Sequence, residues 1–249
     1  MQKNWILLRG LIRGVGHWCD FPKELKTAFP NDDFECIEIP GNGALCDKTS
    51  PATMDEMVEA IRSQSQFIQQ GQKVHILAIS LGAMIATAWA DRYPAEVERL
   101  VLINSSSAKH SKFYERLRPG NYLKMGALLL GYKTRYSVRE MEREILAMTV
   151  NSSERREFAW PLWTKESEDH PIAPKNFFRQ LLAAGNYKFP VEPPVPTVHL
   201  ASENDHFVNV ACSKNLAKSW VCPIYFHPWA GHDLPLDDPQ WVIQQLRAL

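Results

Sequence analysis

Val74–Ile79 is a short apolar run that leads directly into Ser80 and then into a segment dense in small side chains. A run that is apolar on both faces is typical of a central strand in a parallel sheet. Gly82 and four alanines follow within residues 81–93, and they predict a closely packed helix that Pro94 ends. Ser80 is therefore expected on the turn between a buried strand and a helix, which strongly constrains the fold.

The same alternation of apolar runs and helical stretches occurs on both sides of this unit. Alternating strands and helices indicate an α/β fold, in which crossover helices join parallel strands. Further strands are expected at residues 5–8, 34–39, 97–103, 197–201 and 224–226. Further helices are expected at residues 53–70, 210–220 and 239–249. The prediction is a mostly parallel sheet of about six strands flanked by helices.

The middle of the chain breaks this alternation. Residues 108–188 form helical or irregular stretches rich in charged and aromatic side chains, with no convincing strand. Four prolines between residues 189 and 196 stiffen the connection that follows and exclude a helix there. We therefore expect a core in two parts, residues 1–107 and 191–249, interrupted by an inserted helical cap at residues 108–190.

Charge and composition exclude several classes of protein. Lys plus Arg and Asp plus Glu both number 28, so the chain lacks the cationic excess of a dedicated nucleic-acid binder. No apolar stretch approaches the roughly 20 residues that span a bilayer, and the apolar run near the N-terminus is too short for a secretory signal. The five cysteines form no C-x-x-C pair, and zinc-binding and nucleotide-binding motifs do not occur. We expect a cytoplasmic protein with reduced thiols, no metal, no cofactor, no nucleic-acid partner and no membrane span.

Ser80 lies within the pattern A-x-S-x-G, with Ala78 two residues before it and Gly82 two residues after it. The pattern differs by one methyl group from the G-x-S-x-G turn that exposes a nucleophilic serine between a strand and a helix. Small residues flank such a serine because the strained turn brings neighbouring backbone close to it. Ser80 is the candidate nucleophile, and the N–H of Leu81, at the start of a helix, is available to stabilise an oxyanion.

An acid and a histidine follow in the chain order that such a serine requires. Asp205 lies just beyond one expected strand, and His232 lies in a loop beyond the last one. The histidine would take the serine proton, and the carboxylate would orient the histidine. Glu203 and Asp233 are alternative acids, because the first is nearer the strand and the second adjoins the histidine.

With these residues in place, the chain resembles the α/β-hydrolase family along nearly its whole length. It is most similar to the small serine esterases with a helical cap, of carboxylesterase type. The resemblance implies a second oxyanion donor in the loop after the first strand, where the family usually has His-Gly and this chain has Arg9-Gly10. By that match Leu11 donates the second N–H. His17 and Trp18, further along the loop, are expected to contact substrate.

The resemblance implies a serine hydrolase that cleaves carboxylic esters through a Ser-His-Asp triad and an acyl-enzyme intermediate, without a cofactor. The expected substrate is a small-molecule ester. Two alternatives remain open. One is a lyase of the same fold, similar to the menaquinone-pathway synthase and acting on an anionic substrate. The other is a member that binds a ligand without catalysis.

The first part of the predicted cap is basic. Residues 108–146 carry nine Lys and Arg against four Glu, a local charge of plus five, and the cations include Lys133, Arg135, Arg139 and Arg143. Solvated helix faces explain such a surplus. A docking surface for an acidic partner, such as an acyl carrier protein, or for an anionic substrate explains it too.

Overall fold

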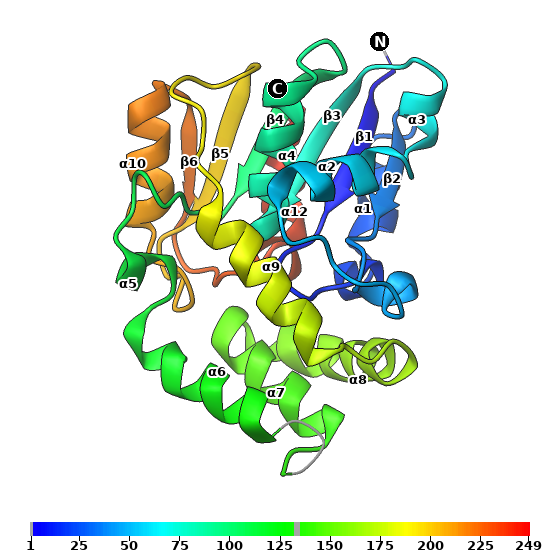
Figure 1. Cartoon of the computed structure of the whole chain (residues 1–249). Coiled ribbons are helices and arrows are strands. Elements are labelled where there is room, and N and C mark those ends of the chain that lie inside the picture. The colour runs from blue at the N-terminus through cyan, green and yellow to red at the C-terminus, as the bar shows by residue number, and fades with distance from the viewer. Residues whose placement is uncertain (1, 132–134) are drawn as a thin grey trace.

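The computed structural model describes residues 2–131 and 135–249 and has the expected α/β architecture. Six strands form one sheet in the order β2-β1-β3-β4-β5-β6, and every neighbouring pair is parallel (Figure 1). The strands are β1 Asn4–Leu8, β2 Asp33–Ile37, β3 Val74–Ile79, β4 Val97–Ile103, β5 Thr197–Ser202 and β6 Ile224–His227. The prediction of about six mostly parallel strands is confirmed.

Helices cover both faces of the sheet because successive strand residues point to opposite faces. In β3, Ile76 belongs to the apolar cluster that includes residues of α2, α4 and α10, whereas Leu77 belongs to the one that includes residues of α1 and α12. The longer core helices are α1 Phe21–Ala28, α2 Met54–Arg62, α4 Leu81–Arg92, α10 Ala211–Trp220 and α12 Pro239–Arg247. The short ones are η1 Val15–Trp18, η2 Gly43–Leu45, α3 Gln66–Gln69 and α11 Leu234–Asp237.

Between β4 and β5 the chain forms further helices, and we call residues 108–190 the cap. Its helices are α5 Phe113–Arg116, α6 Pro119–Gly131, α7 Val138–Thr149, α8 Ser153–Asp169 and α9 Pro174–Asn186. They extend past the carboxyl end of the sheet, below it in Figure 1. Leu146, Ala159 and Trp163 join α7 to α8, and Leu236 of the core completes this cluster. The domain boundaries at residues 107 and 191 stay predictions.

The helix expected at residues 53–70 is two helices, so this part of the prediction was wrong. α2 ends at Arg62, and α3 begins afresh at Gln66. The Glu35 carboxylate of β2 accepts hydrogen bonds from Ser65 Oγ and from the first two N–H groups of α3. This acceptor at the start of α3 favours a separate helix there.

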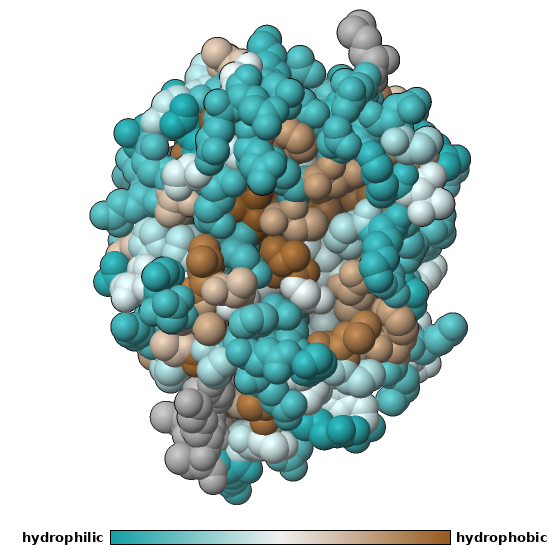
Figure 2. Space-filling model, turned by 90° about the vertical axis from the view of Figure 1, so that its right-hand side faces the viewer, coloured by the Kyte–Doolittle hydropathy of each residue, from teal (hydrophilic) through white to brown (hydrophobic). Residues whose placement is uncertain are grey.

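The surface is largely hydrophilic on the face that Figure 2 shows, with apolar patches among the polar side chains. In the part of the chain that the structure describes, no helix is both long enough and apolar enough to cross a membrane.

Candidate active site

Ser80 lies at the turn between β3 and α4, where the motif predicts it. Its backbone has φ 55° and ψ −114°, a conformation that is unfavourable for a residue other than glycine. Gly82 permits the turn, because a Cβ atom there would lie 2.5 Å from Arg9 O and 2.6 Å from Leu8 O. The end of β1 therefore packs directly on the start of α4, and the loop after β1 is held beside the serine.

Asp205 follows β5 and has only 1% of its surface exposed. Its Oδ1 atom accepts hydrogen bonds of 2.8 Å from the N–H groups of Phe207 and Val208. Its Oδ2 atom lies 2.7 Å from Nδ1 of His232. Both carboxylate oxygens are engaged, so the backbone fixes the carboxylate and the carboxylate fixes the imidazole ring.

The two alternative acids lie elsewhere. Glu203 has an exposed side chain at the surface. Asp233 is buried, but its two oxygens bond to Arg9 rather than to the histidine. Of the three acids weighed from the sequence, the structure brings Asp205 to His232.

Two polar residues that sequence reasoning missed hold the histidine loop. Asn104, at the end of β4, donates from Nδ2 to the backbone O of His232 at 2.8 Å and to Ser202 Oγ at 3.0 Å. Asp237 accepts from the N–H of the residue before His232 at 2.7 Å and from the N–H of Asn151 in the cap. A polar residue directly after the apolar run of β4 was the available signal for Asn104.

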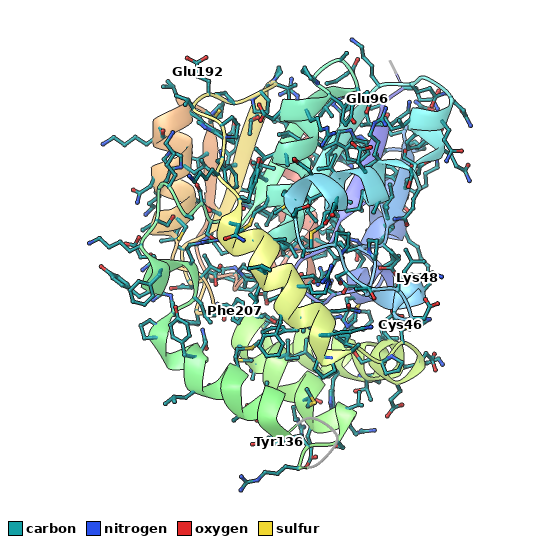
Figure 3. The ribbon with its side chains drawn as sticks, viewed as in Figure 1. Cys46, Lys48, Glu96, Tyr136, Glu192 and Phe207 are labelled. Atoms are coloured by element: carbon teal, nitrogen blue, oxygen red, sulfur yellow. The ribbon has the colours of Figure 1, made fainter. Side chains whose placement is uncertain are left out.

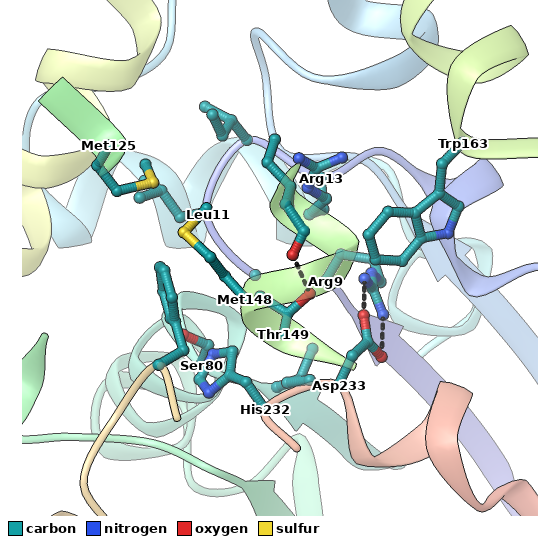
Figure 4. A pocket seen from close by; sticks show the side chains of 15 residues that line it. Arg9, Leu11, Arg13, Ser80, Met125, Met148, Thr149, Trp163, His232 and Asp233 are labelled. Atoms are coloured by element: carbon teal, nitrogen blue, oxygen red, sulfur yellow. Dashed lines mark hydrogen bonds and ion pairs between the residues drawn. The ribbon is translucent and has the colours of Figure 1, made fainter. Parts of the chain in front are cut away.

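Ser80 and His232 lie beside each other in one pocket beneath the cap, which we call the Ser80 pocket (Figure 4). Among the described residues no hydrogen bond joins the serine hydroxyl to the imidazole, and such bonds often tighten only in complexes with substrate. Phe207 lies between the sheet and the cap helices (Figure 3), with its ring 5.1 Å from that of His232. Other walls come from the loop after β1 and from the cap, and include Leu11, Ile145, Met125, Met148 and Trp163.

Leu11 and Leu81 are the residues expected to supply the oxyanion donors. Leu81 is the first residue of α4, where an N–H has no carbonyl partner within the helix. Leu11 lines the Ser80 pocket, and the adjoining Gly10 is so close that a Cβ on it would lie 3.3 Å from Ser80 Cβ. Within the described ranges, neither N–H donates to another residue, so both are available to a ligand.

Two buried arginines at the pocket are bonded to carboxylates. Arg9 Nη1 and Nη2 lie 3.1 and 2.6 Å from the two carboxylate oxygens of Asp233 (Figure 4). Arg13 Nη1 lies 2.7 Å from Glu142 Oε2, and Ser167 Oγ donates to the other oxygen of Glu142. Each cation is therefore neutralised by its own partner. Sequence reasoning could not pair Arg9 with Asp233, because 224 residues separate them.

His17 and Trp18, which were expected to contact substrate, do not line the Ser80 pocket. His17 is 3% exposed, its Nδ1 accepts the N–H of Gly14, and its ring packs on Trp163, which does line the pocket. Burial and the nearby arginine cations lower the pKa of His17 well below its ordinary value. Trp18 lies with its ring 4.7 Å from the guanidinium of Arg9. Both residues support the pocket wall from behind.

Some cations in the basic part of the cap contact other residues, whereas others have exposed side chains. Arg139 and Arg143 both stack on Trp160, each 4.1 Å from a ring centroid. Arg116 is half-buried and donates to the carbonyl O of Ala184. Arg135 has an exposed side chain, and Lys133 lies outside the described residues.

Metal-binding clusters are absent from the described part of the chain: no group of three or more His, Cys, Asp or Glu side chains there is placed to hold an ion. The five cysteines are free thiols.

Solved structures that resemble this chain include an esterase, a lactonase and a further hydrolase. An esterase from Thermogutta terrifontis is 17% identical with a TM-score of 0.73, and the match covers 99% of this chain and 88% of that one. An enol-lactonase from Burkholderia xenovorans LB400 is 13% identical with a TM-score of 0.76, covering 100% and 91%. A 2-hydroxy-6-oxo-6-phenylhexa-2,4-dienoate hydrolase from Rhodococcus sp. strain RHA1 is 17% identical with a TM-score of 0.76, covering 99% and 89%. At these identities the likeness shows the fold.

A sequence comparison identifies the family. No curated protein matches the chain. Residues 6–245 match the sequence model described as the Alpha/beta hydrolase family. Since the matched region covers all of the sheet except the first two residues of β1, and also the cap and every residue of the Ser80 pocket, the chain belongs to the alpha/beta hydrolase family.

Proposed function

We propose that this protein is a serine hydrolase that cleaves carboxylic esters. Ser80 Oγ attacks the ester carbonyl carbon while Nε2 of His232 takes the hydroxyl proton, which then passes to the departing alkoxide. The alcohol leaves, and the acyl group stays on Ser80. Water then gives a proton to the same nitrogen and attacks the acyl carbonyl. The bond from the acyl carbon to Ser80 Oγ breaks, the serine oxygen takes the proton back from His232, and the carboxylic acid leaves. The N–H groups of Leu11 and Leu81 stabilise the oxyanion that forms in each step.

The observation that carries this proposal is the 2.7 Å contact between His232 Nδ1 and Asp205 Oδ2, beside a serine on a strained turn. An Nδ1–H donated to Asp205 leaves Nε2 of the neutral ring able to act as a base. The strained backbone at Ser80 costs on the order of 1–3 kcal/mol. Exposing a nucleophilic hydroxyl at the sheet edge explains that cost.

The charges at the pocket favour a neutral ester over the anionic substrate of a lyase. Arg9 and Arg13 line the pocket, but both already bond to buried carboxylates. An anionic substrate would have to compete with Asp233 or Glu142 and leave a buried charge unpaired, which is costly. Two of the solved relatives are by name an esterase and an enol-lactonase, which supports ester cleavage.

The test is the turnover of a neutral aryl ester, such as p-nitrophenyl acetate, by the wild-type protein and by Ser80→Ala and His232→Ala. Because triad members act as a unit, we expect each substitution to lower kcat/KM by a factor on the order of 10⁴ or more. A fluorophosphonate probe should label the wild-type protein and leave Ser80→Ala unlabelled. Wild-type turnover by Ser80→Ala would overturn the proposal.

The acid has its own test. Asp205→Asn should lower kcat by up to about 10⁴-fold, because the amide favours the wrong tautomer of His232. Glu203→Gln is the matched control, since the exposed Glu203 side chain lies away from the pocket, and it should keep wild-type activity. A larger loss in the control than in Asp205→Asn would rule out the assigned acid.

A further inference from the structure

We infer that the enzyme holds the far end of its ester in a second pocket that takes an apolar chain or ring. This inference rests on the proposed ester hydrolysis and names the substrate class more closely. The second pocket lies under the cap between α7, the end of α8 and the start of α9. Its apolar lining includes Ile12, Val138, Met141, Ile145, Ile172 and Phe177.

The second pocket adjoins the Ser80 pocket. Ile12, Arg13 and Ile145 line both, so the two pockets share these three side chains as a common wall. Ile12 and Arg13 directly follow Leu11, the proposed oxyanion donor. The second pocket therefore begins directly beside the proposed oxyanion site, on the other side of these shared side chains.

The wall has a fixed backbone. Ile12 has φ 48°, which is unfavourable for a β-branched residue. Gln180 of α9 stabilises this conformation by accepting the Ile12 N–H at 2.9 Å. In turn, Gln180 Nε2 donates to Asn42 Oδ1 at 2.7 Å and to Ser50 Oγ at 3.0 Å. The cap and the connection between β2 and α2 thus hold Ile12 at the junction of the pockets.

The polar side chains of the second pocket bond to one another. Glu142 accepts from Arg13 with one oxygen and from Ser167 with the other, each at 2.7 Å. A charged ligand group would lose its hydration without finding an unpaired partner among these three. An apolar group gains from leaving water, at about 0.8 kcal/mol for each buried methylene, or roughly fourfold in kcat/KM. The ligand chemistry that fits is therefore a neutral ester with an apolar extension.

The experiment compares p-nitrophenyl acetate with p-nitrophenyl esters of longer acyl chains, and ethyl acetate with acetates of longer or aromatic alcohols. The first series extends the acyl side of the scissile bond and the second extends the alcohol side. Each substrate is measured with the wild-type protein and with Met141→Trp, which fills the second pocket because Met141 lines only that pocket. Ala147→Trp is the matched control, because Ala147 is an exposed residue of the same helix.

We expect kcat/KM of the wild-type protein to rise with chain length in one of the two series. Met141→Trp should abolish that rise, lower kcat/KM for the longest ester of that series by at least tenfold and leave the turnover of the shortest ester in each series unchanged. Ala147→Trp should behave like the wild-type protein with every ester. A crystal structure with a long-chain alkyl phosphonate bound to Ser80 should show the chain beside Met141 and Phe177.

Equal losses on short and long esters in Met141→Trp would overturn the inference, and so would a wild-type protein indifferent to chain length. In both cases Ser80-dependent acetate turnover would leave the proposed function standing. If no ester is turned over in a Ser80-dependent manner, the proposed function itself fails and this inference fails with it.

Discussion

Arg9 stands where the family usually has a histidine, and its guanidinium reaches the carboxylate of Asp233. Both residues are buried, with 3% and 2% of their surfaces exposed. The pair joins the loop after β1, which carries Leu11, to the loop that carries His232. A buried pair of this kind contributes little net stability compared with apolar side chains, but the loss of one partner leaves the other charge uncompensated.

We expect Arg9→Met to lower the free energy of unfolding by about 3–5 kcal/mol, because Asp233 would stay buried without its cation. Asp233→Leu should lower the free energy of unfolding by a similar amount, because Arg9 would then stay buried without its anion. The double variant should recover most of the loss, since neither charge remains. Urea denaturation of the four proteins measures the coupling between the two positions.

The exposed pair Lys165–Asp169 provides the control for this cycle, with side chains 75% and 52% exposed. Lys165→Met should cause no measurable loss, because solvent screens such a pair. If the losses from Arg9→Met and Asp233→Leu simply add in the double variant, the two residues are not coupled.

Among the helices, the basic part of the cap allows a test of the docking surface for an acidic partner or anionic substrate that the sequence leaves open. Arg139 and Arg143 stack on Trp160, so their reversal would also disturb packing. Lys124 and Arg135 have exposed side chains and allow a cleaner test. We expect Lys124→Glu with Arg135→Glu to lower kcat/KM several-fold for a carrier-bound or anionic ester at low salt. High salt should reduce the difference, because it screens exposed charges.

A neutral ester is the control for these reversals, since neutral substrates gain little from charge steering. Equal losses for the neutral and the anionic ester would point to a damaged cap and remove the docking proposal.

The elements differ in how well local sequence predicts them. β3, Ser80 and α4 were predictable because the buried run, the small residues and Pro94 act within one segment. The break between α2 and α3 was not, because Glu35, the residue that fixes the start of α3, lies 30 residues before Ser65. The residues of the site differ in the same way. Chain order predicted Asp205 and His232, but not the residues that hold their loops. The contacts of Asn104 join strand ends separated by 98 residues, and no local pattern contains them.

At the scale of the whole molecule, buried histidines outside the proposed triad affect stability in acid. Burial lowers the pKa of His17, His75 and His199, in the last case to about 4. His199 lies in β5, its Nε2 has no hydrogen-bond partner among the described residues, and its ring packs 5.9 Å from that of Trp220. Folding keeps this ring neutral at pH values where an exposed histidine is charged.

We expect His199→Phe to make the protein more resistant to acid. Between pH 6.5, the ordinary pKa of histidine, and pH 4, the unfolded chain binds a proton at residue 199 that the folded chain does not. The free energy of unfolding therefore falls as the pH falls through this window, by about 2 kcal/mol at pH 5. Phenylalanine keeps the ring packing on Trp220 and binds no proton, so it should remove this penalty. Urea denaturation should show the variant gaining about 2 kcal/mol more at pH 5 than at pH 7.5, whereas an equal difference at both pH values would show that His199 does not contribute to acid sensitivity.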